Sequence, residues 1–517
     1  MTAEADRALT WREWAGFMAM VVGMFMAILD IQIVSASITD IQAGLAASPD
    51  EVAWVQTSYL IAELVMIPLS GWLSRLLSTR ILFVASALGF TAFSLLCAGA
   101  DSLGAMVVYR AAQGFIGGAM IPTVFATTFL LFPPEKRTQM SVVIGLTATL
   151  APTIGPTLGG WLTERFSWHY LFLINVPVGL GVAAAVWTWM SIDRPDWKLR
   201  HSFDLLGLLL MAAFLGTLEY VLEEGNRWGW FSDPTIFRAG LVCAVSGVLF
   251  FWRMLTAPAP LVDLRAFRNA NFAFGSLFSF VLGIGLYGSI YLLPLFLGRV
   301  RGYNSLQIGE TMFVTGAAMF ISAPVAGQLA KLLDLRVMLA LGLTMFGAGL
   351  WWMAELTTDS AFWELFGPQA LRGASMMLIM LPVNQLALGR LPPASVKNAS
   401  GLYNLMRNLG GAVGLALINT IATDRMALHT LRLSEQVTWS RPGAQAVSGE
   451  IANALAAAKG SAAPLAALKE LARMVEMQAL TMTYNDLLLL MAGAFFAALP
   501  FTLLLAKPAS QGAVGAH

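Results

Sequence analysis

The chain contains fourteen stretches of about 20 mostly apolar residues, and each is long enough to cross a bilayer as an α-helix. They lie at about 15–39, 53–73, 81–99, 103–131, 139–162, 171–191, 204–222, 235–255, 272–297, 307–330, 337–356, 366–389, 401–424 and 484–506. Only 12% of the 517 residues are charged, about half of what soluble domains carry, and 57% are hydrophobic. This balance excludes a soluble enzyme or a disordered scaffold, and a net charge of +1 gives nucleic acid little to bind. The sequence therefore predicts an all-α polytopic membrane protein.

The distribution of Lys and Arg predicts the orientation of the chain. An even number of spans places both termini on one side of the membrane. Seventeen basic residues fall in loops on that side, and five fall in the short loops on the other side. Because short cytoplasmic loops carry the excess of basic residues, we expect both termini in the cytoplasm.

An internal repeat predicts two similar halves. The segment from Pro68 to Arg80 shares its Pro, Gly, Leu, basic, Leu-Leu and Arg positions with the segment from Pro324 to Arg336, 256 residues later. At an offset of 259, Gln113-Gly114 corresponds to Arg372-Gly373, and Pro133-Pro134 corresponds to Pro392-Pro393. Two matches at nearly one period indicate parallel repeats, as in transporters built from two six-helix halves around a midplane site.

The repeat predicts the domain organisation. Residues 1–191 form an N-terminal six-helix bundle, and residues 192–271 form an inserted pair, spans 7 and 8, with flanking cytoplasmic loops. Residues 272–506 form a C-terminal six-helix bundle that includes an outer loop at 425–483, and residues 507–517 form a cytoplasmic tail.

Five ionisable residues lie at membrane depth within the predicted spans: Asp30, Glu63, Arg110, Arg372 and Arg407. Each costs about 2.5–3.5 kcal/mol at the bilayer centre, so each requires an explanation. A buried carboxylate beside an arginine can titrate near neutrality, because desolvation favours its neutral form and the cation favours its charged form. We therefore predict that Asp30, Arg110 and Glu63 couple transport to protons. The alternative is that Asp30 and Arg110 only hold helices together. Four further carboxylates lie nearer span ends, where their side chains are expected to reach the interface: Glu219, Glu310, Glu355 and Glu364.

The sequence offers no chemistry for an enzyme. Its two cysteines lie in apolar runs and its four histidines show no ligand spacing. It contains no phosphate-binding loop and no nucleophile elbow. Accordingly no catalytic residue, metal site or cofactor is predicted.

Several motifs resemble one family. Leu29-Asp30-Ile31-Gln32-Ile33-Val34, Arg110-Ala-Ala-Gln113-Gly114, the glycines and prolines from Gly145 to Gly160, the segment from Trp168 to Gly179, and Asn404-Leu-Met-Arg407 are similar to motifs of the fourteen-helix drug:proton antiporters of the major facilitator superfamily. The likeness is greatest to EmrB-type multidrug efflux permease subunits. Gln32, Ser35 and Thr39 replace the Thr, Asn and Pro that are usual in the first motif.

The resemblance implies a major facilitator fold and specific site residues. The arginine of the fourth-helix motif, here Arg110, is tied to proton coupling, and the fifth-helix motif is associated with exporters. We predict that the substrate cavity and its gating helices include Gln113, Gly114, Gly155, Pro156, Gly159, Asn384 and Arg407. We predict a cytoplasmic gating loop with Gly71, Arg75 and Arg80, but Arg75 stands where the superfamily has an Asp. A charge-pair gate built on that Asp cannot operate here in its usual form.

The function that the resemblance implies is export of hydrophobic or amphipathic small molecules in exchange for protons, by alternating access, in a bacterial inner (plasma) membrane. EmrB-type permeases work with a periplasmic adaptor, or membrane fusion protein, and an outer-membrane channel, so these are the implied partners besides the lipid bilayer. Alternatives are an exporter of one siderophore, amino acid or lipid, a membrane-embedded enzyme, and a subunit that scaffolds a complex without transport.

The outer loop at 425–483 is the candidate for the adaptor contact. After Pro464 it contains a helical pattern with Leu465, Leu468, Leu471, Val475 and Leu480 on one side. Such an apolar stripe requires a partner surface, which is either the adaptor or the membrane face of the protein itself.

Overall fold

The computed structural model describes residues 9–389, 391–438 and 440–506, and these residues fold into α-helices joined by loops and short 3-10 turns. The predicted tail at 507–517 lies outside them. The α-helices are α1 (Trp11–Ala36), α2 (Ile38–Gly44), α3 (Pro49–Val52), α4 (Trp54–Leu77), α5 (Thr79–Ala98), α6 (Leu103–Gly117), α7 (Met120–Leu131), α8 (Pro134–Arg165), α9 (Tyr170–Leu173), α10 (Asn175–Trp189), α11 (Leu205–Glu224), α12 (Pro234–Thr256), α13 (Ala270–Arg299), α14 (Ser305–Leu332), α15 (Leu335–Met353), α16 (Phe362–Leu388), α17 (Pro393–Gln436), α18 (Pro442–Lys459) and α19 (Ala463–Ala498).

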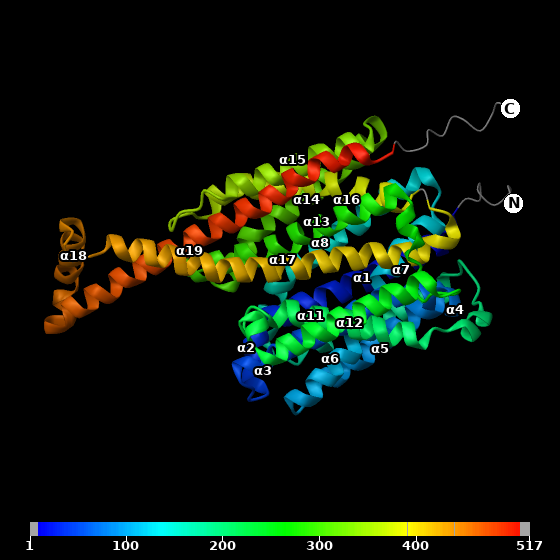
Figure 1. The fold of residues 1–517 in the computed structure, drawn as a ribbon, viewed down its shortest axis with the longest axis horizontal. Coiled ribbons are helices and arrows are strands. Elements are labelled where there is room, and N and C mark those ends of the chain that lie inside the picture. Colours follow the sequence, from blue (N-terminus) through cyan, green and yellow to red (C-terminus); the bar gives the residue numbers. More distant parts are fainter. Residues whose placement is uncertain (1–8, 390, 439, 507–517) are drawn as a thin grey trace.

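Within the described part of the chain, fourteen helical segments are long and apolar enough to cross a membrane. The predicted number of spans is therefore confirmed. Helix α1 begins, and α19 ends, at the same end of the bundle, which we call the proximal end; the opposite end is the distal end (Figure 1).

The fourth span is not one continuous helix. It divides into α6 and α7, which are separated by Gly118 and Ala119. A Cβ atom on Gly118 would lie 3.0 Å from the carbonyl oxygen of Glu63 in α4, so the break occurs where two backbones come close together. Pro122, in the first turn of α7, lacks the N–H group that would continue the hydrogen-bond ladder of α6.

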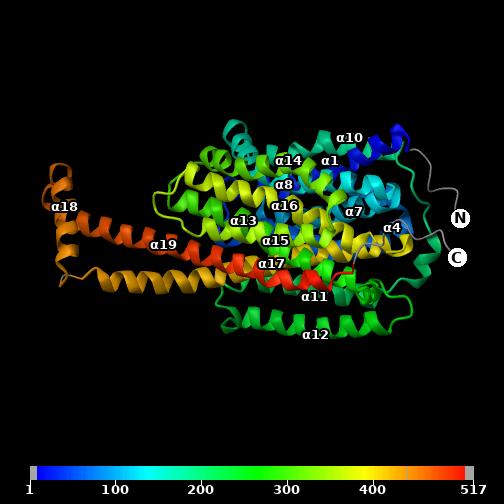
Figure 2. The ribbon, with the colours of Figure 1, turned by 90° about the horizontal axis from the view of Figure 1, so that it is seen from above.

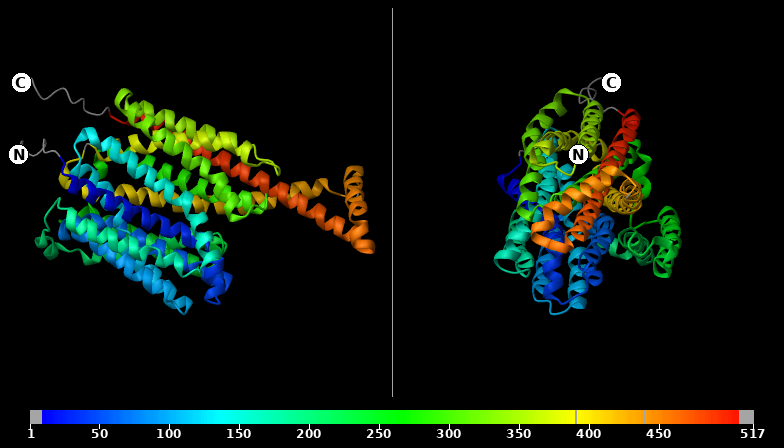
Figure 3. Two further views of the ribbon diagram at one scale, coloured as in Figure 1. Left: turned by 180° about the vertical axis from the view of Figure 1, so that it is seen from behind. Right: turned by 90° about the vertical axis from the view of Figure 1, so that its left-hand side faces the viewer.

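Most of the segment predicted as an outer loop at 425–483 is helical, including the part after Pro464 for which a helix was predicted. Helix α17 extends for 44 residues, about 66 Å, and α19 begins at Ala463, some 20 residues before the predicted start of the last span. Together with α18 they form an extension that projects from the distal end (Figures 1 and 3). The alternative that this segment folds back onto the membrane face of the protein is therefore wrong.

The same helix pairs recur in the two halves of the chain. Helix α1 packs on α8, α4 on α6 and α5 on α10, and in the second half α13 packs on α17, α14 on α16 and α15 on α19. The repeat extends to single glycines. A Cβ atom on Gly114 would lie 2.3 Å from the carbonyl oxygen of Tyr59, and one on Gly373 would lie 2.3 Å from that of Thr315. The predicted fold class, two six-helix bundles and an inserted pair, is confirmed; the predicted residue boundaries of the domains stay a prediction.

The inserted pair lies at one side of the two bundles. Helix α12 is the outermost helix, and its neighbour α11 lies between it and the bundles (Figure 2). Helix α11 packs against α4 of the first half and α17 of the second.

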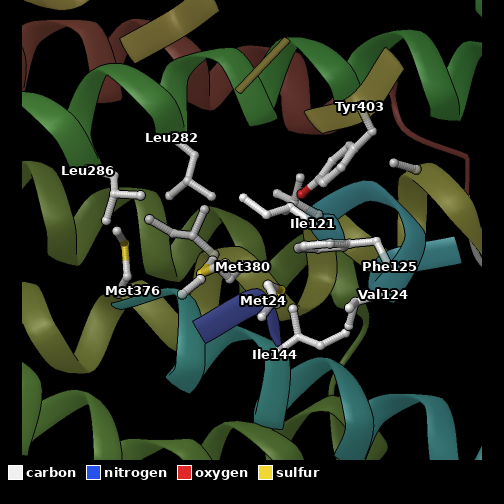
Figure 4. Close-up of a cluster of buried hydrophobic side chains, with 14 of the residues drawn as sticks. Met24, Ile121, Val124, Phe125, Ile144, Leu282, Leu286, Met376, Met380 and Tyr403 are labelled. Atoms are coloured by element: carbon white, nitrogen blue, oxygen red, sulfur yellow. The ribbon is translucent and has the colours of Figure 1, made fainter. Parts of the chain in front are cut away.

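Buried apolar side chains fill the space where the two halves meet. Figure 4 shows ten of them: Met24, Ile121, Val124, Phe125, Ile144, Leu282, Leu286, Met376, Met380 and Tyr403. They come from α1, α7, α8, α13, α16 and α17, so both halves contribute to one core.

The close approach of α6 to α4 gives a direct test of this packing. We expect Gly114→Ala to destabilise the protein by about 1–3 kcal/mol, because its Cβ atom would overlap the backbone at Tyr59. The matched control is Gly104→Ala on the same helix, since a Cβ atom there would meet no atom within 4 Å. The measurement is thermal unfolding of the two variants in detergent, and equal melting temperatures would contradict the proposed packing.

Candidate functional site

A buried ion pair joins α1 to α6. The Nη1 atom of Arg110 lies 2.6 Å from Oδ2 of Asp30, and the two residues are 0% and 1% exposed. Both side chains are thus removed from solvent, and sequence analysis correctly identified them as the residues that require a partner at membrane depth. The structure brings them together; their role in proton coupling stays a prediction.

Side chains from two further helices complete a polar cluster around this pair. Asn175, at the start of α10, donates to Oδ1 of Asp30 at 2.7 Å, and Gln113 of α6 donates to the same oxygen at 3.4 Å. Gln113 also accepts from Arg110 at 2.7 Å and donates to Ser94 of α5 at 2.6 Å. Arg110, Gln113 and Asn175 therefore all donate to the carboxyl oxygens of Asp30. A set of donors alone is the arrangement that suits a charged carboxylate.

Helix α4 holds the other face of Arg110. Its Nε atom donates to the carbonyl oxygen of Val55 at 3.2 Å, and its guanidinium group lies 4.3 Å from the centre of the Tyr59 ring. Its Nη2 atom is buried without a partner among the described residues. Five helices, α1, α4, α5, α6 and α10, thus surround the ion pair.

Glu63 does not belong to this cluster. It is 3% exposed and lines a separate cavity between the two halves, here called the central cavity. Its polar lining comprises Gln32, Glu63, Glu219, Glu223, Tyr287, Arg407 and Asn408, from α1, α4, α11, α13 and α17. The three residues predicted to couple protons therefore occupy two sites, and only Asp30 and Arg110 are in direct contact.

Arg407 lines the central cavity, as sequence analysis predicted for a cavity residue. Its Nη2 atom donates to Asn404 at 2.6 Å, and the guanidinium group lies 5.1 Å from the centre of the Phe125 ring. Its Nη1 atom is buried and has no hydrogen-bond partner among the described residues.

The other predicted cavity and gating residues lie elsewhere. Gln113 belongs to the ion-pair cluster, and Gly114 packs on α4. Gly155 and Gly159 of α8 lie against α1, where added Cβ atoms would be 2.5 Å from the Gln32 side chain and 2.9 Å from the Ile33 carbonyl oxygen.

Two predicted residues, Pro156 and Asn384, take no part in these contacts. Pro156 lies inside α8, and Asn384 of α16 is buried with an unpartnered side-chain oxygen within the described chain. Arg372, also singled out by its depth, is buried and donates to the Thr315 hydroxyl at 3.2 Å.

Burial distinguishes Glu219 from the other carboxylates near span ends. Glu310, Glu355 and Glu364 are exposed, as expected of side chains that reach the interface. Glu219 is only 6% exposed and lines the central cavity, so the interfacial prediction for it is wrong. The prediction failed because α4 and α17 cover this face of α11, and their positions are not encoded in the local sequence.

The predicted gating loop lies at the proximal end, where the two halves are in contact. A Cβ atom on Gly71 would lie 2.8 Å from the Asn398 backbone of α17. The backbone carbonyl of Arg75 accepts from the Asp196 amide at 3.1 Å, and the Arg80 guanidinium group lies 4.9 Å from the Trp187 ring centre.

An aspartate from a different part of the chain provides the acidic group that is missing at position 75. Asp193, after α10, accepts from the Thr79 backbone amide at the start of α5 and forms an ion pair with Lys397 of α17. The Lys397 ammonium group also donates to the Ser74 carbonyl oxygen at 2.9 Å. No local sequence pattern indicates this bridge, because its partners are 204 residues apart.

Hydrogen bonds and close packing complete the contact between the halves near the proximal end. The Ser400 hydroxyl donates to the Pro122 carbonyl oxygen at 2.7 Å, and Gln385 donates to Thr138 at 2.7 Å. The central cavity lies farther along α4 and α17, towards the distal end. This arrangement describes a molecule that is closed at its proximal end.

No group of three or more His, Cys, Asp or Glu side chains that could hold a metal ion occurs among the described residues. Both cysteines, Cys97 and Cys243, are free. The polar groups described above thus belong to three places: the cluster around Asp30 and Arg110, the central cavity, and the proximal contact between the two bundles.

Comparison with known proteins identifies relatives over most of the chain. Residues 20–415 match the family model of the Major Facilitator Superfamily. The chain is 45% identical over 489 residues to the colistin resistance protein EmrB of Acinetobacter baumannii, covering 93% of this chain and 94% of that protein. It is 29% identical over 503 residues to the multidrug export protein EmrB of Escherichia coli K12, covering 96% of this chain and 97% of that protein. It is 31% identical over 418 residues to the fatty acid resistance protein FarB of Neisseria gonorrhoeae, covering 81% of this chain and 82% of that protein.

Solved structures with similar folds are also transporters. The human organic anion transporter MFSD10 matches with a TM-score of 0.56 at 13% identity, over 93% of this chain and 99% of that chain. A bacterial homologue of the lysosomal transporter Spinster, in an inward-facing conformation, matches with a TM-score of 0.53 at 14% identity, over 97% and 100%.

The Asp193–Lys397 bridge is expected to hold the proximal end closed. Replacing Lys397 by Met removes an ion pair worth about 1 kcal/mol, which shifts the closed population about five-fold. A cysteine at buried Ser400, in a Cys243→Ser background, should then react several-fold faster with a maleimide.

The matched control for this prediction is Lys331→Met, because Lys331 is the exposed basic residue of the second repeat copy. The maleimide rate is measured in membrane vesicles for both variants. An unchanged rate in Lys397→Met would show that the bridge does not close this end.

Proposed function

We propose that this chain, which belongs to the Major Facilitator Superfamily as an EmrB-type multidrug permease, exports amphipathic compounds in exchange for protons. The observation that carries the coupling proposal is the fully buried pair of Asp30 and Arg110. We place the protein in a bacterial inner membrane, with the proximal end in the cytoplasm and the distal extension in the periplasm. The basic residues of the loops support this orientation.

A proton on Asp30 would change the balance of forces at the centre of the first bundle. Neutralising the carboxylate leaves the Arg110 charge buried without compensation, and uncompensated buried charges cost about 3–5 kcal/mol. A difference of this size changes the ratio of two conformations by about 100-fold or more. Binding of one proton is therefore sufficient to favour a conformation in which Arg110 finds other partners.

Glu63 is the second carboxylate in this scheme. It has no hydrogen-bond partner among the described residues and lies in the central cavity, where cargo and protons compete for space and charge. The two sites are connected through α4, because Tyr59, one turn before Glu63, packs against Arg110. Cargo in the cavity thereby acts on the helix that supports the ion pair.

The distal extension is proposed to bind a periplasmic adaptor of a tripartite efflux system. Leu465 is 73% exposed, and Leu468 and Met474 are also exposed on α19. The ends of α17 and α19 project from the bundle, so these residues lie beyond the membrane-spanning part (Figure 3). Exposed apolar side chains on a projecting helical pair are typical of a protein interaction surface.

The second candidate function is export of a single kind of compound, and the names of the relatives support this candidate. One relative is named for colistin resistance and another for fatty acid resistance, two chemically different compounds. Competition among unrelated dyes in an efflux assay distinguishes the two candidates, since an exporter of one compound would show none.

The coupling proposal predicts the phenotype of Asp30→Asn. We expect this variant to lose efflux driven by a pH gradient in proteoliposomes by about ten-fold or more, because the side chain no longer gains and loses a proton. Exchange of cargo across the same vesicles, which requires no net proton movement, should persist. Asp40→Asn on α2 is the control, since Asp40 is exposed. Full gradient-driven efflux in Asp30→Asn would exclude Asp30 as the coupling residue.

The adaptor proposal predicts a separation of assembly from transport. The double substitution Leu465→Glu and Leu468→Glu should abolish co-purification with the adaptor, because charged groups are costly to bury in an apolar interface. Efflux by the purified permease in proteoliposomes should be unchanged. The control is the exposed Lys469→Ser. Normal adaptor binding by the Leu465/Leu468 variant would place the contact elsewhere.

A further inference from the structure

Glu219 is a carboxylate in the inserted helix pair that faces the inside of the transporter. It lies one turn before the end of α11, and α11 packs against α4 and α17, the helices that carry Glu63 and Arg407. Helix α12 covers the other side of α11 (Figure 2). The inserted pair thus contributes a charged side chain to the cavity between the bundles, although it belongs to neither repeat.

The Glu219 carboxylate has an unused hydrogen-bonding atom. The residue is 6% exposed, and its Oε2 atom is buried with no hydrogen-bond partner in the described part of the chain. Leaving a charged group unpaired in such a place costs several kcal/mol. A carboxyl group in this position avoids the cost either by holding a proton or by pairing with a cation that enters the cavity.

The charge of the central cavity indicates the sign of that partner. Three carboxylates line it, Glu63, Glu219 and Glu223, and Glu223 is exposed at its mouth. Arg407 carries the only guanidinium group among these lining residues; its Nη2 atom donates to Asn404, and its Nη1 atom is unpartnered among the described residues. Tyr287, the remaining titratable side chain of the lining, is neutral as a phenol and donates to Asn408 at 3.3 Å. Carboxylates in excess over cations favour a positively charged ligand.

The apolar part of the lining indicates the rest of the ligand. Leu60, Leu286 and Ile290 face the same cavity from α4 and α13. A cavity of about 90 Å³ in this closed molecule is far below the 300–1,000 Å³ of occupied drug-sized sites, so it must widen to accept cargo. Gly411 lies beneath the Tyr287 ring, and its lack of a Cβ atom lets this lining ring pack directly on α17.

We propose that Glu219 of the inserted helix α11, together with Glu63, forms the anionic wall that binds the positively charged group of an amphipathic organic cation. The apolar body of the cation lies against Leu60, Leu286 and Ile290. This inference rests on the proposed export function and adds to it a cargo class and a role for the inserted helices.

The test is equilibrium binding of radiolabelled tetraphenylphosphonium to the purified full-length protein in detergent. Its matched probe is tetraphenylborate, which has similar size and apolar surface but the opposite charge. We expect the wild-type protein to bind the cation about ten-fold or more tightly than the anion, and Glu219→Gln to weaken cation binding about ten-fold. Glu219→Asp, which keeps the charge, should restore most of the affinity.

The control variant is Glu224→Gln on the same helix. Glu224 is buried but accepts from Trp228 at 3.0 Å and is not part of the cavity lining. Cation binding should be unchanged in this variant, and size-exclusion profiles should match the wild type for all three substitutions.

Three outcomes would overturn the inference: no preference of the wild-type protein for the cation, unchanged cation affinity in folded Glu219→Gln, or equal loss of both probes in that variant. The first comparison needs no substitution, so it can overturn the anionic wall even if Glu219→Gln fails to fold. Binding in detergent requires no proton gradient. Failure of gradient-driven efflux tests on Asp30 would therefore leave this measurement interpretable, and the reverse also holds.

Discussion

The ion pair between Asp30 and Arg110 is the interaction on which the first bundle depends. Hydrocarbon offers neither water nor counter-ions, so each buried charge must be satisfied by protein groups. Arg110 obtains them from Asp30, Gln113 and the Val55 carbonyl oxygen, and Asp30 obtains a further donor from Asn175. These partners come from different helices, so satisfying the pair fixes how α1, α4, α6 and α10 meet. A change of charge at Asp30 would therefore act on the contacts among these four helices.

Closure of the proximal end shows how a missing motif residue is replaced in three dimensions. Sequence analysis concluded that a charge-pair gate could not form with Arg75 in the place of an acidic residue. Asp193 provides the carboxylate from the segment after α10, where it accepts from the amide of Thr79 and pairs with Lys397 of α17. Asp193 lies at the N-terminus of α5, a favourable position for an acidic side chain, although it comes from a different part of the chain. The physical requirement, an anion between the two bundles, is met without the sequence motif.

Most of the membrane fold could be predicted from the sequence, because a span requires a long apolar run and a parallel repeat leaves matching glycines. The site could be predicted only in part. Depth in a span identified Asp30 and Arg110, but their partner Asn175 is 145 residues from Asp30, and no local pattern indicates that contact. Only the part of the distal extension after Pro464 was predicted as a helix, because elsewhere polar residues end the apolar signal while helix propensity continues. Glu219 was misjudged because its burial depends on neighbours that hydropathy does not place.

The position of Glu219 also indicates that the inserted helices contribute to the central cavity and do more than fill space beside the bundles. A pair that only filled space beside two complete bundles would face them with apolar side chains, since lipid and protein interiors are similarly apolar. Helix α11 instead presents a carboxylate to the junction of α4 and α17, at a cost that lipid cannot offset. Both of these helices belong to the contact between the halves, so a ligand held by Glu219 and Glu63 would touch both bundles and the insertion at once. Binding at this junction would therefore act on α4 and α17, the helices that also meet at the proximal end.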